Sequence, residues 1–190
     1  MSKAYVFLAN GFEDVEALIP VDVLRRGGVN VITVSCVDGS QVVESAHGVR
    51  IEADALFEDC NFDDADLLLL PGGMPGASNL YNHQGVRQAV ADQDAANGLI
   101  AAICAAPAVV LGQMGLLRGR RVTCYPGFEM MLGGALYTGA LCTVDGNITT
   151  GEGPAAAFPF AYALLEQLVD KETAQQVAVG MRFAHLMDEK

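Results

Sequence analysis

Residues 98–107, GLIAAICAAP, form a short apolar run that stops at a cysteine and continues into small residues and a proline. A run of this length with the β-branched residues Ile100 and Ile103 is typical of a buried strand. Pro107 suits the first turn of a helix. The segment therefore predicts a strand, a tight turn at Cys104 and a helix, which is the repeating unit of an α/β fold with a parallel sheet.

Cys104 lies at the turn of this predicted unit, with its sulfur directed at the start of the following helix. Unpaired N–H groups and the helix dipole lower the pKa of a thiol in that position. The arrangement is similar to a nucleophile elbow with cysteine in place of serine, although the glycines of that motif are absent. We expect Cys104 to be an anionic nucleophile at neutral pH; the alternative is a buried cysteine that only packs.

Strand-like and helix-like segments alternate along the chain. Strands are predicted at residues 5–9, 29–37, 49–51, 66–70, 99–104, 121–125, 141–144 and 147–150, and helices at 13–26, 86–97, 107–114, 153–169 and 171–181. Such alternation predicts a mostly parallel sheet with helices on both faces. The length of 190 residues suits one domain covering residues 1–190.

Composition excludes several function classes. The chain carries 11 Lys and Arg against 23 Asp and Glu, a net charge of −12, which argues against nucleic-acid binding through a basic surface. Its apolar runs are far shorter than the roughly 20 residues that span a bilayer, and no signal peptide is expected. The five cysteines show no C-x-x-C spacing, so neither a disulfide framework, a zinc site nor another metal cofactor is predicted. A reducing cytoplasm suits this usage.

A second buried strand ends in Pro71-Gly72-Gly73. Ligands bind outside the carboxyl ends of the strands in parallel sheets, so this loop is expected beside Cys104. Glycine lets backbone approach a ligand, and the amides of Gly73 and Ala105 could then form an oxyanion hole. The alternative is an ordinary tight turn.

Glu16 is the third candidate. It opens a predicted helix together with Glu13 and Asp14, and it is followed by apolar residues, which indicates that it faces inward. A buried carboxyl has a raised pKa, and a neighbouring thiolate raises it further. A protonated Glu16 could donate a hydrogen bond to the sulfur and act as general acid and base.

The three histidines do not complete a cysteine–histidine pair. They stand at positions 47, 83 and 185, and each is expected to be structural or solvated. Peptidase chemistry of the papain type is therefore not favoured.

Three ordered motifs together resemble one known family. They are residues 11–16 (GFEDVE) followed by 19–22 (IPVD), then 70–73 (LPGG), then 101–107 (AAICAAP), and Gly153-Pro154 continues the pattern. On these motifs, which span nearly the whole chain, the sequence resembles the ThiJ/PfpI superfamily, in the branch of the Parkinson-disease-associated protein deglycase and its bacterial YajL-like relatives.

The resemblance implies a flavodoxin-like three-layer sandwich and a homodimer. It implies Cys104 as nucleophile, Glu16 as its protonated partner, and the amides of Gly72, Gly73 and Ala105 around the site. The implied activity is a glyoxalase or deglycase that needs no cofactor and acts on small α-oxoaldehydes such as methylglyoxal or on their glycated adducts. The alternative is an oxidative-stress sensor or chaperone-like protein that works through oxidation of Cys104. Many relatives carry an older label of thiazole monophosphate biosynthesis.

Three positions depart from many of these relatives. Tyr125 stands where a histidine is common, Glu152 where arginine or glutamine precedes the Gly-Pro pair, and Ala46 roughly where an arginine helps to bind anions. A carboxylate at position 152 disfavours anionic ligands and raises the pKa of a nearby thiol. Without an imidazole, Glu16 would have to transfer the protons.

Overall fold

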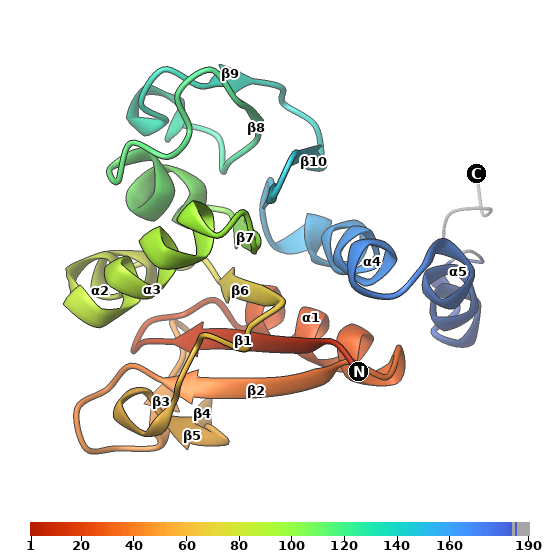
Figure 1. Ribbon diagram of the computed structural model, residues 1–190, viewed down its shortest axis with the longest axis horizontal. Helices are drawn as coiled ribbons and strands as arrows, with labels where there is room; N and C mark the ends of the chain where they lie inside the picture. Colours follow the sequence, from red (N-terminus) through yellow and green to blue (C-terminus); the bar gives the residue numbers. More distant parts are fainter. Residues whose placement is uncertain (184, 186–190) are drawn as a thin grey trace.

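A seven-stranded sheet runs through the centre of the computed structural model, which describes residues 1–183 and 185 (Figure 1). Its spatial order is β10-β11-β7-β6-β1-β2-β5, and neighbouring strands are parallel except for the antiparallel pair β10 and β11. The strands are β1 (Lys3–Leu8), β2 (Asn30–Ser35), β5 (Ala55–Leu56), β6 (Leu67–Leu70), β7 (Leu99–Ile103), β10 (Cys142–Asp145) and β11 (Ile148–Gly151). Two small additional sheets pair β3 (Val42–Glu44) with β4 (Arg50–Glu52) and β8 (Arg121–Val122) with β9 (Leu136–Tyr137).

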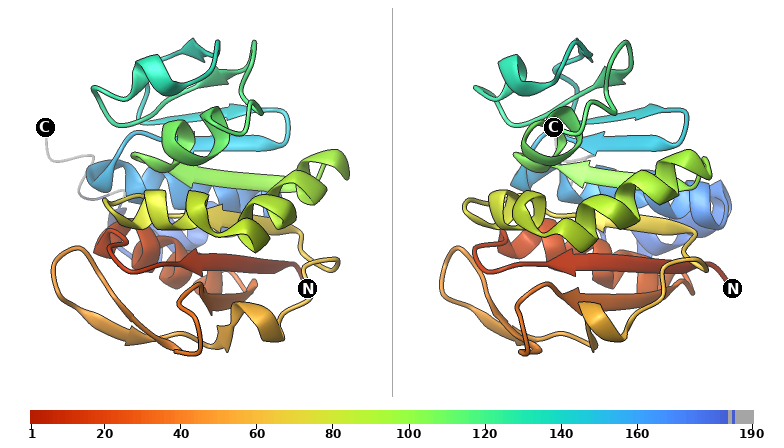
Figure 2. Two further views of the ribbon diagram at one scale, coloured as in Figure 1. Left: turned by 90° about the vertical axis from the view of Figure 1, so that its left-hand side faces the viewer. Right: turned by 60° about the vertical axis from the view of Figure 1, so that its left-hand side comes forward.

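Helices cover both faces of the large sheet (Figure 2). One layer holds α1 (Asp14–Arg26), α4 (Ala157–Leu168) and α5 (Lys171–Gly180), and the other holds α2 (Gly76–Asn82), α3 (Gln84–Ala95) and the π-helix η2 (Pro107–Gly112). Short 3₁₀ turns complete the chain: η1 (Phe57–Asp59), η3 (Glu129–Met131) and η4 (Pro154–Ala156). The predicted flavodoxin-like α/β sandwich is confirmed.

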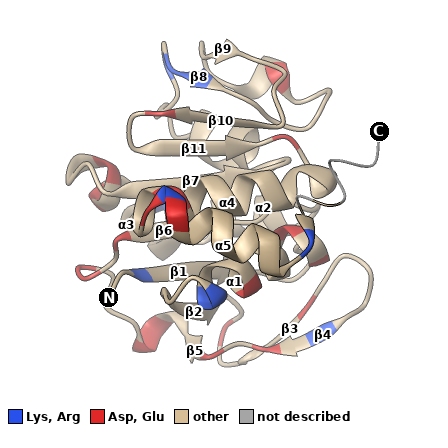
Figure 3. Cartoon of the chain, turned by 90° about the vertical axis from the view of Figure 1, so that its right-hand side faces the viewer, with Lys and Arg blue, Asp and Glu red and all other residues tan. Residues whose placement is uncertain are grey.

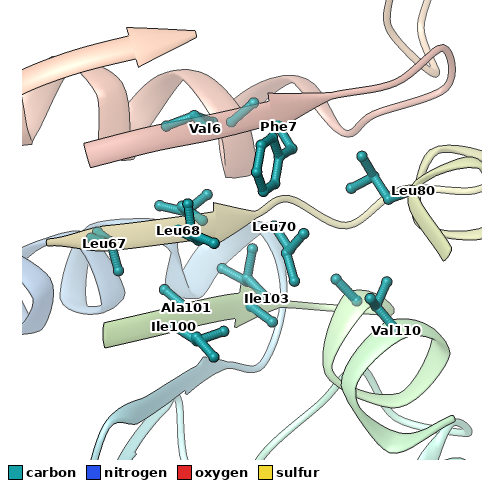
Figure 4. Packing of buried hydrophobic residues seen from close by; sticks show 14 of the residues in the cluster. Val6, Phe7, Leu67, Leu68, Leu70, Leu80, Ile100, Ala101, Ile103 and Val110 are labelled. Atoms are coloured by element: carbon teal, nitrogen blue, oxygen red, sulfur yellow. The ribbon is translucent and has the colours of Figure 1, made fainter. Parts of the chain in front are cut away.

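The core lies around β1, β6 and β7. All four leucines of β6 are fully buried, and so are Ile100 to Ile103 of β7. Figure 4 shows the labelled side chains of β6 and β7 meeting those of Val6 and Phe7 from β1, with Leu80 and Val110 closing the space from the helical side. Because helices cover both faces, these strands are apolar at every position rather than alternating. The carboxyl ends of β6 and β7, which form the site below, are therefore fully buried.

Several predicted elements differ from those observed. The helix predicted at 107–114 is a π-helix that ends at Gly112, and the strand predicted at 121–125 stops at Val122. After Val122, the Thr123 N–H donates to the Thr150 hydroxyl (2.9 Å) and the Tyr125 N–H donates to the Cys104 carbonyl (2.8 Å), so neither continues a ladder. The short helix α2 was not predicted.

The Lys and Arg residues form no continuous basic face in the view of Figure 3. In Figure 3 the Lys and Arg segments are short and lie apart from one another. Within residues 1–183 and 185, no helix has the length and apolar character required to cross a bilayer.

Leu68→Ala tests the packing of the central strand. Leu68 is fully buried in β6, so the variant should lower the free energy of unfolding by about 2–5 kcal/mol through lost apolar contact and the cavity left behind. The matched control is Leu136→Ala, whose side chain is 60% exposed and whose effect should stay under about 0.5 kcal/mol. Urea unfolding followed by circular dichroism measures both; equal losses would contradict the burial described above.

Candidate active site around Cys104

Cys104 directly follows β7 in a strained turn. Its φ angle is +65°, in the left-handed region that residues with a side chain seldom adopt. Hydrogen bonds hold this conformation from two sides: the Cys104 N–H donates to the Gly151 carbonyl (3.0 Å), and the Cys104 carbonyl accepts from the Tyr125 N–H (2.8 Å). The residue is only 8% exposed. The predicted elbow is thus present, without the glycines that usually accompany it.

Glu16 reaches the same place from the first turn of α1. The helix begins there because the Glu13 carboxylate accepts a hydrogen bond from the Glu16 N–H (2.8 Å) and so caps the free end of the backbone. The Glu16 side chain is fully buried, and its Oε2 accepts from the Gly72 N–H (3.0 Å). Its other oxygen, Oε1, is buried and has no hydrogen-bond partner among the described residues.

Gly72 brings the carboxyl and the cysteine together. A Cβ atom at position 72 would lie 2.5 Å from Glu16 Oε2 and 2.6 Å from Cys104 Cβ, distances that no side chain tolerates. Gly73 has a φ of +85°, and a Cβ there would lie 2.5 Å from the Glu13 N atom. The glycines after β6 are therefore required for close backbone approach. The structure brings together all five predicted site residues: Cys104, Glu16, Gly72, Gly73 and Ala105.

The pKa of the Glu16 carboxyl is raised from 4.5 to about 7, chiefly because the group is buried. Within that net shift the Cys104 thiol and the Gly72 N–H lower the pKa, and the neighbouring Glu13 carboxylate raises it. Glu16 therefore keeps its proton over a far wider pH range than an exposed carboxyl does. The predicted direction for Glu16 is confirmed.

The prediction of a lowered thiol pKa is wrong. Burial, the Glu16 charge and the Glu16 hydrogen bond raise the pKa of Cys104 from 9.0 to about 12, although the N–H groups of Gly73 and Ala105 act in the opposite direction. Those amides are where the prediction placed them, but they are outweighed by desolvation and by the neighbouring carboxylate.

The two acidic groups titrate as a pair. The first proton leaves near pH 7 and the second near pH 12, so between these values Glu16 and Cys104 together hold one proton and one negative charge. Transfer of that proton from sulfur to carboxyl gives a thiolate beside a neutral acid. A reactive thiolate here thus depends on Glu16 accepting the proton rather than on a helix dipole.

A hollow of about 270 Å³ lies next to the cysteine turn. It is lined by Tyr125, Pro126 and residues 152–156, and Tyr125 is 46% exposed. Tyr125 and Gly151, the residue before Glu152, are the two backbone contacts of Cys104. The part played by Gly151 had no sequence signal, because it acts through its carbonyl oxygen.

His83 is structural and His47 is solvated, as predicted for both. His83 Nδ1 accepts from the Val86 N–H (3.1 Å) at the start of α3. His47 is exposed and pairs with Asp14 (2.6 Å), which raises the pKa of the imidazole. Neither is among the groups that shift the pKa of Cys104.

One cluster within residues 1–183 and 185 has ligand atoms close enough for a metal ion, namely Glu13, Asp14 and His47. Their atoms already serve other contacts: Glu13 caps α1, and Asp14 accepts from Ser45 and pairs with His47. The cluster is accounted for by the start of the helix and its contact with the β3–β4 hairpin.

Comparison with known proteins shows that the chain is similar to the members of one family. Residues 2–167 match the model of the DJ-1/PfpI family. Among curated proteins, the Parkinson disease protein 7 homolog of Danio rerio is 41% identical over 92% of this chain and 94% of its own length. The glutathione-independent glyoxalase DJR-1.2 of Caenorhabditis elegans is 33% identical over 84% of each chain. The chain spans about 40% of the length of the related DJ-1 homolog B of Arabidopsis thaliana.

Solved structures give the same result. The DJ-1 superfamily protein STM1931 from Salmonella typhimurium, solved as a mutant, superposes with a TM-score of 0.91 at 36% identity, over 95% of this chain and 98% of that one. An oxidized form of Toxoplasma gondii DJ-1 gives a TM-score of 0.91 at 35% identity with the same coverage.

Glu16→Gln should remove a pH dependence of stability. The folded protein retains the Glu16 proton up to about pH 7, whereas the unfolded chain releases it near 4.5. The free energy of unfolding should therefore fall by about 3 kcal/mol between pH 4.5 and 7.5 in the wild type relative to the variant. Urea titrations at several pH values measure this. The control Glu166→Gln, which neutralises an exposed carboxyl on α4, should keep the wild-type fall; parallel curves for wild type and Glu16→Gln would contradict the assignment.

Alkylation of Cys104 by iodoacetamide should follow the titration of the pair. The wild-type rate should rise up to about pH 7 and then level off, because loss of the first proton makes the thiolate form accessible. In Glu16→Gln the inflection near pH 7 should disappear. Mass spectrometry of the peptide that contains Cys104 separates its modification from that of the other cysteines, and the same profile in both proteins would show that the two groups are not coupled.

Proposed function

This chain belongs to the DJ-1/PfpI family, and we propose that it is a cysteine-dependent glyoxalase that converts small α-oxoaldehydes such as methylglyoxal to 2-hydroxy acids without a metal or organic cofactor. The observation that carries the proposal is the Cys104 thiol held in a strained turn against the buried Glu16 carboxyl. The name of the Caenorhabditis elegans relative, a glutathione-independent glyoxalase, supports it. The same chemistry extends to glycated adducts of these aldehydes.

The first step uses the one-proton state of the pair. With the proton on Glu16, the Cys104 thiolate attacks the aldehyde carbon, a carbon–sulfur bond forms, and the carbonyl electron pair moves to oxygen. The N–H groups of Gly73 and Ala105 lie at the sulfur and are suited to stabilise this alkoxide. Glu16 then gives its proton to the alkoxide, which yields a neutral hemithioacetal.

The remaining steps move two protons and add one water. The Glu16 carboxylate removes the proton from the carbon bonded to sulfur and passes it to the ketone oxygen, and an enediol forms. The hydroxyl on the sulfur-bearing carbon then loses its proton while the neighbouring carbon gains one, which gives the thioester of a 2-hydroxy acid. Water then cleaves the carbon–sulfur bond, the acid leaves, and the thiol regains its proton. The sum is one oxoaldehyde and one water to one 2-hydroxy acid, with no oxidant or reductant.

Tyr125 and Glu152 direct the choice of substrate. Both line the hollow beside the cysteine turn. A phenol is a poor proton acceptor at neutral pH, which leaves the proton transfers to Glu16. A carboxylate at position 152 disfavours anionic ligands, so uncharged aldehydes fit this chain better than phosphorylated or carboxylated ones.

The proposal also includes that the protein forms a homodimer and is located in the cytoplasm. Val15 and Leu18 on α1 are each 39% exposed, and Val49 beside β4 is 47% exposed. The His47–Asp14 ion pair holds the β3–β4 hairpin against the start of α1, so these apolar side chains lie on neighbouring elements. A second copy of the chain would remove them from water.

The alternative function is an oxidative-stress sensor or chaperone-like protein that works through Cys104. The observation that favours it is the buried Glu16 Oε1, which has no partner among the described residues and, when it carries the carboxyl proton, could donate a hydrogen bond to an oxygen of a Cys104 sulfinate. A Toxoplasma gondii relative has been solved in an oxidized form. Sulfinate formation is not readily reversed, so the modification would be long-lived.

Lactate formation from methylglyoxal tests the glyoxalase. We expect turnover by the wild type, none by Cys104→Ala, and a loss of about 10²–10⁴-fold in kcat/KM for Glu16→Gln, because proton transfer is removed. Cys60→Ala is the matched cysteine control and should retain activity. Proton NMR measures the product.

Equal rates for wild type and Cys104→Ala would falsify the enzyme proposal. Absence of turnover in the wild type, together with a gain of about 32 Da at Cys104 after mild peroxide treatment, would favour the sensor instead.

A further inference from the structure

A larger hollow of about 440 Å³ lies away from the cysteine turn. It is lined by η1, by residues 60–63 before β6 and by one side of α3, from Gly85 to Ala96. None of its lining residues belongs to the Cys104 turn, the Gly72–Gly73 loop or α1. In Figures 1 and 2, α3 lies in the helical layer opposite α1 and α4. The hollow is therefore separate from the proposed active site.

Aromatic rings form its apolar wall. The rings of Phe57 and Phe62 lie 5.0 Å apart, and both contact Phe7, which is fully buried beneath them. Gly85 allows α3 to approach this wall, because a Cβ there would lie 2.5 Å from Phe57 Cε1. The rings are thus fixed by packing, and together they offer a preformed surface for a flat apolar group.

Carboxylates form its rim. Asp63, from the loop before β6, and Asp92, from α3, are both exposed lining residues. Neither is in an ion pair within the described part of the chain, and no Lys, Arg or His lines the hollow. Gln88 donates to Asp92 Oδ1 (2.9 Å), which leaves Oδ2 available. The nearby Lys3 is occupied by Asp64 (2.6 Å).

We propose that this hollow binds a small organic cation with an aromatic body, of the arylalkylammonium class. The ring would pack on Phe57 and Phe62, and the ammonium group would lie between Asp63 and Asp92. A cation gains from both the carboxylates and the aromatic faces, whereas an anion is repelled by the rim and by the net charge of −12. The volume lies in the range of small-molecule sites.

Three probes with the same phenylpropyl body and different charge test the proposal: 3-phenylpropan-1-ammonium, 3-phenylpropan-1-ol and 3-phenylpropanoate. Chemical-shift titration of ¹⁵N-labelled protein gives each Kd and locates the binding on α3 and η1. The cation should bind about fivefold more tightly than the alcohol, the anion should not bind, and 1 M NaCl should reduce the preference for the cation.

Charge-matched variants test whether Asp63 and Asp92 cause the preference for the cation. The double variant Asp63→Asn, Asp92→Asn should lower the affinity for the cation to that for the alcohol. The affinity for the alcohol should not change. The control pair Glu166→Gln with Glu172→Gln changes the net charge equally on α4 and α5, and Glu172 is contacted by Gln176 as Asp92 is by Gln88. It should keep the preference for the cation.

A third variant, Ala89→Leu, partly fills the hollow and should weaken both the cation and the alcohol. Equal affinities for cation and alcohol, equal effects of the two charge-matched pairs, or no saturable shifts at α3 would each overturn the proposal. Lactate formation should be unaffected by all these variants. The test of cation binding is therefore independent of the test of the proposed glyoxalase activity.

Discussion

A fully buried carboxyl beside a thiol is costly to ionise, and this cost determines the protonation states of the two groups in the site. Glu16 and Cys104 come from segments far apart in the sequence, and the Gly72 amide donates to the carboxyl between them. Burial raises both pKa values, and the Glu16 charge raises that of Cys104 further, so near neutral pH the pair loses one proton and keeps the other. That retained proton lets a thiolate and a neutral acid exist together in an apolar surrounding.

The sheet supplies the rigidity that such a pair requires. β6 and β7 are neighbouring parallel strands, fully apolar and covered by helices on both faces, and the Gly72–Gly73 loop and Cys104 directly follow their carboxyl ends. Loops at that edge meet because all of these strands point the same way. The positive φ of Cys104 is maintained by hydrogen bonds to Gly151 and Tyr125, so strain at the nucleophile is balanced by contacts from the neighbouring chain segments.

The two hollows differ in ways that matter for ligands. The one beside the cysteine turn contains a single carboxylate, Glu152, and a half-exposed phenol, and it is the one we propose for small uncharged carbonyl compounds. The one beside α3 has a preformed aromatic wall and two unpaired carboxylates, and it suits a cation. A strongly acidic chain thus presents two separate environments, neither of which favours anions.

Much of this could be predicted from the sequence, because local patterns report local structure. Apolar runs of strand length, separated by helical periodicity, predict the parallel sheet, and Pro71-Gly72-Gly73 and Cys104 follow two of those runs, which places them at one edge. The inward position of Glu16 was also visible, from the apolar residues that follow it. The helix α2 was not visible, because its seven residues are too few for a periodic pattern and it is stabilised by packing against η2.

The sequence by itself determined which residue types gather at the carboxyl edge of the sheet. Only the tertiary structure decided the direction in which the thiol pKa moves. A helix dipole can be anticipated from a turn and a proline, but the loss of water around Cys104 and the proximity of Glu16 arise when distant segments pack together, and these two effects outweigh the amides. The aromatic and acidic hollow beside α3 likewise exists only because residues 57–63 fold against that helix.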